Sequence, residues 1–267
     1  MIAIWSFARV GRLEPVWRKR RVGILLEISE LIAADRHLYH VVTQDLAQSL
    51  RSSATVECRD LIDVAAILDP EIHAAIWRRP INNRIVDLLR RPECGFDTPS
   101  RFVGRIHDLD KERDLADLVP AAARAIDPTG AEDLVADVSL ICEMFSELVC
   151  ADEVMISLES PDNATCPRFH VDRVGIRMLV TYLGPGTELL PQGQVDRNWL
   201  GDAAHGLVDE ESGLMLPGAE VQQVSAFDVV LLKGEAWPGA ENFGAVHRSP
   251  DPHGQRRVLL RLSLIHI

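Results

Sequence analysis

Three residues in the later part of the sequence have side chains that bind divalent metal ions, namely His170, Asp172 and His247. His170 and Asp172 stand two positions apart, so on a β-strand both side chains project from one face and can bind one metal. This pair alone is weak evidence, because nine His and 22 Asp in 267 residues give 9 × 22/267, or about 0.7, chance occurrences of the spacing. The neighbouring elements must therefore support the site.

Several strand-like segments place these residues in a common framework. An apolar run follows Asp172 and leads into the tight turn Gly184–Glu188. His247 lies on a short predicted strand after a second apolar run, and Arg257 and Arg261 follow on the last predicted strand. The two arginines are four residues apart and share a strand face, so alternation allows either guanidinium to bind a carboxylate.

From Ala151 onward the sequence predicts short β-strands separated by turns that contain Gly or Pro, without helices between them. This pattern is typical of a sandwich or a jelly roll. The predicted strands are Glu153–Leu158, Arg168–Asp172, Gly175–Leu183, Glu220–Ser225, Asp228–Lys233, Gly244–Arg248 and Arg256–Leu264.

Before residue 150 the apolar residues mostly follow helical spacing. We predict helices over 24–32, over Ile72–Leu89 with an interruption at Pro80, and over Ala131–Val149, whereas Arg90–Asp110 is predicted to be a loop. Helices first and strands second predict an α+β chain, with a mainly helical region over 1–150 and a β-barrel over 151–267. We expect one integrated unit, because a barrel with few strands needs a covering layer.

The bulk composition restricts the partners and the compartment. A formal net charge of −12 and a pI near 5.2 argue against nucleic acid as a partner. The five cysteines are odd in number and show no C-x-x-C spacing, which fits reduced thiols. The apolar start, Met1 to Phe7, is too short for a secretory signal, and no run is long enough to span a membrane. The sequence predicts a cytoplasmic protein.

The order H-x-D, several strands, a distal His and then an Arg resembles the iron(II)- and 2-oxoglutarate-dependent dioxygenases. The resemblance implies a double-stranded β-helix (a jelly-roll, cupin-like barrel) in which His170, Asp172 and His247 form the facial triad that binds Fe(II). It further implies 2-oxoglutarate as a small-molecule cosubstrate. Because the ten residues from His247 to Arg257 match the spacing usual in that superfamily, Arg257 is preferred over Arg261 for the far carboxylate of the cosubstrate. Tyr182 is a further candidate for this binding site.

Five short motifs are also similar to an uncharacterised bacterial family, the domain of unknown function number 1826. This resemblance brings no established activity, but it extends into the predicted helical half and supports one integrated unit. The motifs are Ala75–Pro80, Cys166–Asp172, Gly184–Glu188, Lys233–Gly239 and Ala245–Pro250.

The residues leave an alternative open. The same three ligands can hold zinc without redox chemistry, in a non-catalytic metal-binding or metal-sensing protein of the cupin-like class. The substrate of an oxygenase is likewise open, a small molecule or a protein side chain, and the metal can be iron or zinc.

The end of the sequence has a different character. Leu262–Ile267 resembles the translation of a sequencing adapter, so we expect His266 not to be a metal ligand.

Overall fold

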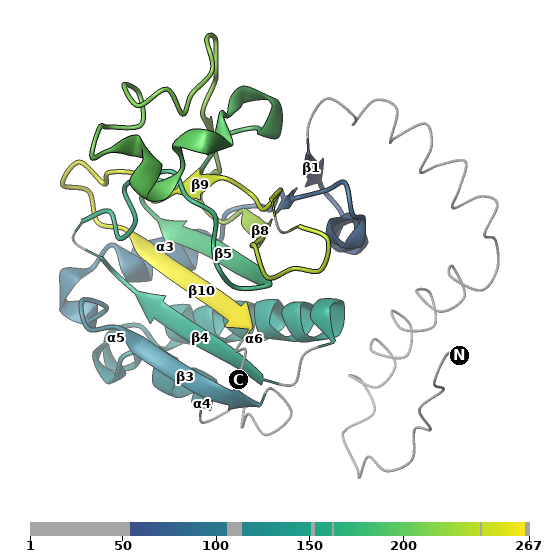
Figure 1. Cartoon of the computed structure of the whole chain (residues 1–267). Coiled ribbons are helices and arrows are strands. Elements are labelled where there is room, and N and C mark those ends of the chain that lie inside the picture. The colour runs from purple at the N-terminus through teal and green to yellow at the C-terminus, as the bar shows by residue number, and fades with distance from the viewer. Residues whose placement is uncertain (1–53, 106–113, 151–152, 162, 241, 265–267) are drawn as a thin grey trace, which may run out of the picture. The chain divides into compact units, whose positions relative to one another are not determined.

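The computed structural model describes residues 54–105, 114–150, 153–161, 163–240 and 242–264 (Figure 1). The helix predicted over 24–32 and the predicted exclusion of His266 as a ligand lie outside these residues. The described part is a mixed α/β structure with one large sheet, one small sheet and few helices.

The main sheet has seven strands in the order β1-β2-β8-β5-β10-β4-β3. Neighbouring strands are antiparallel except for the pair β1 and β2, which is parallel. In the centre, Leu260 of β10 lies opposite Val180 of β5 on one side and Leu158 of β4 on the other. The strands are β1 Thr55–Cys58, β2 Ala74–Trp77, β3 Ser100–Arg105, β4 Glu153–Glu159, β5 Ile176–Leu183, β8 Val229–Lys233 and β10 Val258–Leu264.

The second sheet contains β7 (Gln222–Gln223), β6 (Glu188–Leu189) and β9 (His247–Arg248), in that order. One apolar cluster joins it to the main sheet, because alternate residues of the long strands point toward Leu189 of β6. The cluster consists of Ala74, Ile76, Leu179, Leu189, Val224, Val230, Leu232, Ala245 and Leu259.

Helix α6 (Pro128–Val149) packs on the other face of the main sheet, behind β4 and β10 in Figure 1. It begins where Asp127 caps the amide of Gly130 at 3.0 Å and ends at Cys150, which has a left-handed φ of 48°. The remaining helices are α3 Asn83–Leu89, α4 Asp114–Leu118 and α5 Ala121–Ile126, with the short 3-10 helices η1 Leu61–Leu68, η2 Pro92–Cys94, η4 Gln192–Gln194, η5 Arg197–Trp199 and η6 Gly201–Ala204. No helix among the described residues combines the length and apolar character needed to cross a membrane.

Two predictions before residue 150 are wrong. The segment predicted as one helix over Ile72–Leu89 contains strand β2, and only its end, from Asn83, is helical. β2 lies inside the sheet and is buried on both faces, so its apolar run does not alternate. Likewise, the predicted loop Arg90–Asp110 contains the edge strand β3.

The predictions from residue 131 onward agree better with the structure. The helix over Ala131–Val149 and the strands β4, β5, β8 and β10 are confirmed. The strands predicted around Gln222 and His247 are only two residues long, and Arg168–Asp172 is not a regular strand, because only His170 forms a bridge. Leu262 and Ser263 of the suspected adapter segment are buried in β10.

The sheet crosses the boundary expected near residue 150. β2 pairs with β8, and β3 pairs with β4, so strands from both sides of that position share one ladder. This topology supports our proposal that the two predicted regions form one integrated unit.

Candidate metal centre

A short backbone bridge brings the two histidines side by side. The amide of His170 donates to the carbonyl of His247, and the amide of His247 donates back to His170, both at 3.0 Å. Their neighbours Phe169 and Val246 are buried in an apolar cluster outside the site. The two imidazole rings consequently turn the other way, with their centroids 4.5 Å apart.

Asp172 completes the group, although its segment is irregular. Its Oδ1 lies 3.8 Å from Nε2 of His170, and its Oδ2 lies 3.4 Å from Nε2 of His247. The three potential ligand atoms all lie within 4.8 Å of one another, and this is the one such group in the part of the chain that the structure describes. The structure therefore brings the three predicted ligands together without the regular strand expected to do so.

The turn after β8 fixes the position of Asp172. The amide of Glu235 donates to the carbonyl of Asp172 at 2.8 Å. A Cβ atom at Gly234 would lie 2.5 Å from that carbonyl oxygen and 2.1 Å from the carbonyl oxygen of Val174. Only glycine permits this close backbone contact, which explains the Gly in the Lys233–Gly239 motif.

Both imidazoles are held in the same tautomer by backbone carbonyls. Nδ1 of His170 lies 2.9 Å from the carbonyl oxygen of Arg168, and Nδ1 of His247 lies 3.0 Å from that of Ala245. Because a carbonyl oxygen only accepts, each Nδ1 carries the proton. Each Nε2 is therefore left with a lone pair that faces Asp172 and can bind a metal.

The electrostatics of the group favour a neutral His170 and a charged Asp172. Burial lowers the pKa of His170, and the neighbouring His247 lowers it further. Burial alone would raise the pKa of Asp172, but His247, Arg177 and His170 bring it below its ordinary value. Nε of Arg177 lies 3.0 Å from Oδ2 of Asp172, yet neither atom makes an aligned hydrogen bond.

The histidines line a cavity with about 330 Å³ of empty space, part of it open to solvent. Arg177, Arg257 and Arg261 also line the cavity, as do Thr187 and Ser249. The metal-ligand group thus adjoins a hollow that carries several positive charges.

Arg257 lies at the inner wall of this cavity and is 2% exposed. Its Nε donates to the carbonyl of Pro185 at 2.9 Å, its Nη1 to Oγ of Ser249 at 2.8 Å and its Nη2 to Oγ1 of Thr181 at 3.4 Å. Burial lowers the pKa of Arg257 to about 10. All three hydrogen-bond acceptors are neutral, so no carboxylate among the described residues forms an ion pair with this guanidinium.

Arg261 lines the same cavity but has a carboxylate partner. Its Nη2 forms an ion pair with Glu159, and its Nε donates to Oγ of Ser157 at 3.4 Å. The prediction that both arginines share a face agrees with this placement, and their partners distinguish them.

Tyr182 does not reach the cavity, contrary to the prediction. Its hydroxyl donates to Oδ2 of Asp137 on α6 at 2.7 Å, and its ring packs edge-on against Phe227 at 5.4 Å. On β5, Arg177 and Leu179 face the cavity, so alternation directs Tyr182 to the opposite face of the sheet. Counting positions along β5 from Arg177 would have shown this.

The motif Ala75–Pro80 also has a structural explanation. Arg78 forms ion pairs with Glu57 and Asp228, and Arg79 forms one with Asp137. These contacts join β1, β8 and α6, and they lie away from the metal-ligand group.

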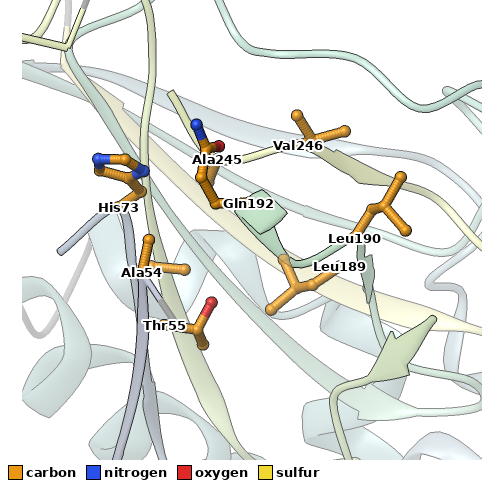
Figure 2. A pocket seen from close by; sticks show the side chains of 9 residues that line it. Ala54, Thr55, His73, Leu189, Leu190, Gln192, Ala245 and Val246 are labelled. Atoms are coloured by element: carbon orange, nitrogen blue, oxygen red, sulfur yellow. The ribbon is translucent and has the colours of Figure 1, made fainter. Parts of the chain in front are cut away.

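A second cavity has a different lining (Figure 2). His73, Gln192 and Thr55 are the labelled side chains with polar atoms there, and the others are aliphatic. Burial and the charges of Lys233 and Arg197 lower the pKa of His73 to about 4. One histidine among aliphatic side chains does not form a metal site.

Fold and site together define a mixed α/β protein in which a His-Asp-His group of metal-ligand geometry lies between two sheets. Residues 58–263 match the family described as "Protein of unknown function (DUF1826)", so the chain belongs to that family. No curated protein matched the sequence.

Solved structures with similar chain traces include oxygenases. The dioxygenase for auxin oxidation 1 from Arabidopsis thaliana, in a complex with 2-oxoglutarate, has 10% identity and a TM-score of 0.43, over 80% of this chain and 92% of that one. A 2OG-Fe(II) oxygenase family protein from Caulobacter crescentus has 15% identity and a TM-score of 0.41, over 79% and 86%. The rice dioxygenase for auxin oxidation has 13% identity and a TM-score of 0.37, over 79% and 82%. At these low scores the function must be argued from the site.

Proposed function

We propose that this protein is an iron(II)- and 2-oxoglutarate-dependent dioxygenase that hydroxylates a small molecule or a protein side chain. The two facing sheets would form the double-stranded β-helix, and His170, Asp172 and His247 would hold the iron. When bound, iron(II) activates O₂ while 2-oxoglutarate loses CO₂ and becomes succinate, and one oxygen atom enters the substrate.

The donor set of the site fits this metal. Two imidazole nitrogens and one carboxylate on one side of an ion leave open positions, as in non-haem iron(II) oxygenases. Oδ2 of Asp172 is buried and makes no aligned hydrogen bond among the described residues, so it has capacity for a ligand bond. Both Nε2 atoms are directed to the same place by the backbone carbonyls that bind Nδ1.

The single observation that carries the proposal is Arg257. Burying a guanidinium without a carboxylate partner costs free energy, unless a ligand supplies the opposite charge. Ser249, Thr181 and the carbonyl of Pro185 hold the guanidinium in place, and the cavity connects it with the histidines. A dicarboxylate cosubstrate could chelate the metal at one end and pair with Arg257 at the other.

The remaining properties of the chain agree with this role. The net charge of −12 makes nucleic acid a poor substrate. None of the five cysteines, all of which the structure describes, forms a disulfide, which suits the cytoplasmic location that we propose.

Succinate formation tests the proposal. Protein purified without oxygen would be loaded with Fe(II), ascorbate and 2-oxoglutarate, and then exposed to O₂. We expect succinate from uncoupled turnover in the wild-type protein and only background in His170→Ala. Absence of succinate above that control, together with tight zinc binding, would instead indicate a non-catalytic metal-binding or metal-sensing protein.

A further inference from the structure

Asp209 lies in the segment between η6 and β7. Its buried carboxylate binds the two residues that precede His170. Its side chain is 1% exposed. Oδ2 accepts a hydrogen bond from the backbone amide of Phe169 at 2.8 Å, and Oδ1 accepts one from Nε of Arg168 at 2.6 Å. A further hydrogen bond stabilises the segment that contains Asp209, because Oγ of Ser212 donates to the carbonyl of Asp209 at 3.1 Å.

One peptide group connects this carboxylate with the imidazole. The N–H that donates to Asp209 and the carbonyl that accepts from Nδ1 of His170 belong to the same planar amide, between Arg168 and Phe169. Hydrogen bonds in such a chain polarise one another. Negative charge at the N–H end makes the carbonyl oxygen a stronger acceptor, which strengthens its bond to Nδ1–H and increases the electron density at Nε2.

The second histidine lacks this arrangement. Nδ1 of His247 bonds to the carbonyl of Ala245 at 3.0 Å, and the amide of that peptide belongs to Val246. Within the described ranges, no hydrogen bond joins the amide of Val246 to a carboxylate. The two imidazoles therefore have the same acceptor type but differ in what polarises it.

We propose that Asp209 is a positioning residue that acts on His170 through the Arg168–Phe169 peptide, orienting the imidazole and raising the basicity of Nε2. The proposal rests on the metal site of the proposed function, but not on oxygenase activity. Changes to the partners of metal-bound histidines typically alter metal affinity by about 10- to 100-fold.

Asp209 also has contacts that a purely structural role would use. Nη1 of Arg248 lies 3.3 Å from its Oδ2, while the guanidinium of Arg248 lies 4.3 Å from the ring centre of Phe169 and Nε donates to Glu188 at 2.6 Å. Two control variants separate the roles. Arg168→Met removes an ion pair of Asp209, and Glu188→Gln weakens the ion pair between Glu188 and Arg248. Both variants keep the hydrogen bond from the amide of Phe169 to Asp209.

The test uses the full chain labelled with ¹⁵N at histidine, together with Zn²⁺ titrations. In the metal-free protein, the ¹⁵N shift of Nδ1 reports its hydrogen bond. We expect Asp209→Asn to change this shift at His170 but not at His247, and to weaken Zn²⁺ binding by about tenfold. Arg168→Met and Glu188→Gln should leave both readouts near wild type.

Two results would overturn the proposal: an unchanged His170 shift and Zn²⁺ affinity in folded Asp209→Asn, or equal losses in the two control variants. If Asp209→Asn does not fold, the wild-type protein decides, since Zn²⁺ loading should move the amide resonance of Phe169 more than that of Val246. An equal or smaller movement at Phe169 would contradict the relay. Succinate formation plays no part in these measurements, so failure of the oxygenase proposal remains distinguishable.

Discussion

Two buried arginines at opposite faces of the main sheet have contrasting partners. Arg79, which follows β2, donates to both carboxylate oxygens of Asp137 on α6 at 2.8 and 3.2 Å. Arg257, which precedes β10, donates only to neutral oxygens in the cavity. Breaking a charge pair within the chain destabilises the fold, whereas a charge with only neutral partners is available to bind an anionic ligand. The comparison predicts that substitutions on the α6 side alter stability and substitutions on the cavity side alter ligand binding.

The largest effect should follow removal of the whole α6 side. A chain that starts at Glu153 lacks α6, the Arg79 and Asp137 pair, and three strands of the main sheet. We expect it to be insoluble or to unfold without a cooperative transition, because β4 and β8 would each lose a neighbouring strand. A chain that starts at Ser52 is the matched control and should unfold cooperatively in a urea titration followed by circular dichroism. Cooperative folding of the shorter chain would contradict the proposal of one integrated unit.

On the cavity side, the metal ligands should give the next largest effect. Alanine at His170, Asp172 or His247 removes one of three protein donors, so metal affinity should fall by about a hundredfold or more, beyond what the loss of an outer partner costs. The midpoint of urea unfolding of the metal-free protein should change little for His170→Ala, since that side chain is 29% exposed. Metal content after identical purification is the measurement. Full occupancy in all three variants would show that the site is wrong.

Arg79→Met should lower stability without changing metal affinity, which is the opposite of what we expect for the metal-ligand variants. It leaves the carboxylate of Asp137, whose side chain is 20% exposed, without its cationic partner. Removing one partner of a buried pair costs about 3–5 kcal/mol, and partial exposure should reduce the loss to about 2–3 kcal/mol in the free energy of unfolding. Zinc affinity should stay at the wild-type value. Normal stability with weakened metal binding in this variant would contradict the expectation that the α6 side governs stability and the cavity side governs ligand binding.

The part of the site that the sequence predicted depends on local patterns. Types and spacing identified His170, Asp172 and His247, and strand periodicity identified β5 and β10 around them. The pairing of the two histidines needed no regular strand at residue 170, because one bridge to His247 suffices. The prediction therefore succeeded for the residues while failing for the element.

Contacts between residues that are distant in the sequence could not be predicted from local patterns. The sequence of β2 predicted a helix because both faces of this strand are buried and its apolar residues do not alternate. That burial is provided in part by β8, which lies far away in the sequence. Asp209 is one of 22 aspartates, and nothing near it in the sequence indicates that it accepts the amide of Phe169. Spacing from His247 led us to prefer Arg257 over Arg261 in the sequence, whereas the ion pair of Arg261 with Glu159 is visible only in the tertiary structure.

The smallest of these predicted effects is also the most specific, and it concerns Arg257. A guanidinium paired with a carboxylate in a buried cavity contributes about 1.5–3 kcal/mol, so Arg257→Ala should weaken 2-oxoglutarate binding by about tenfold or more. Arg257→Lys should restore only part of the affinity, because a point charge does not reproduce the two parallel hydrogen bonds of a guanidinium. The free energy of unfolding should change less than in Arg79→Met, because the loss of three hydrogen bonds to neutral oxygens is offset by the removal of a buried guanidinium without a carboxylate partner.

Anaerobic titration of 2-oxoglutarate into the iron-loaded variants, followed by the metal-to-ligand charge-transfer band, measures the affinity. Arg261→Ala is the internal comparison on the same cavity wall. Because Arg261 already forms an ion pair with Glu159, its removal should weaken the cosubstrate less than the removal of Arg257 does. An unchanged dissociation constant for Arg257→Ala, with loss of binding in Arg261→Ala, would transfer the carboxylate site to Arg261. Arg257 would then resemble Arg79 as a buried arginine that serves the fold.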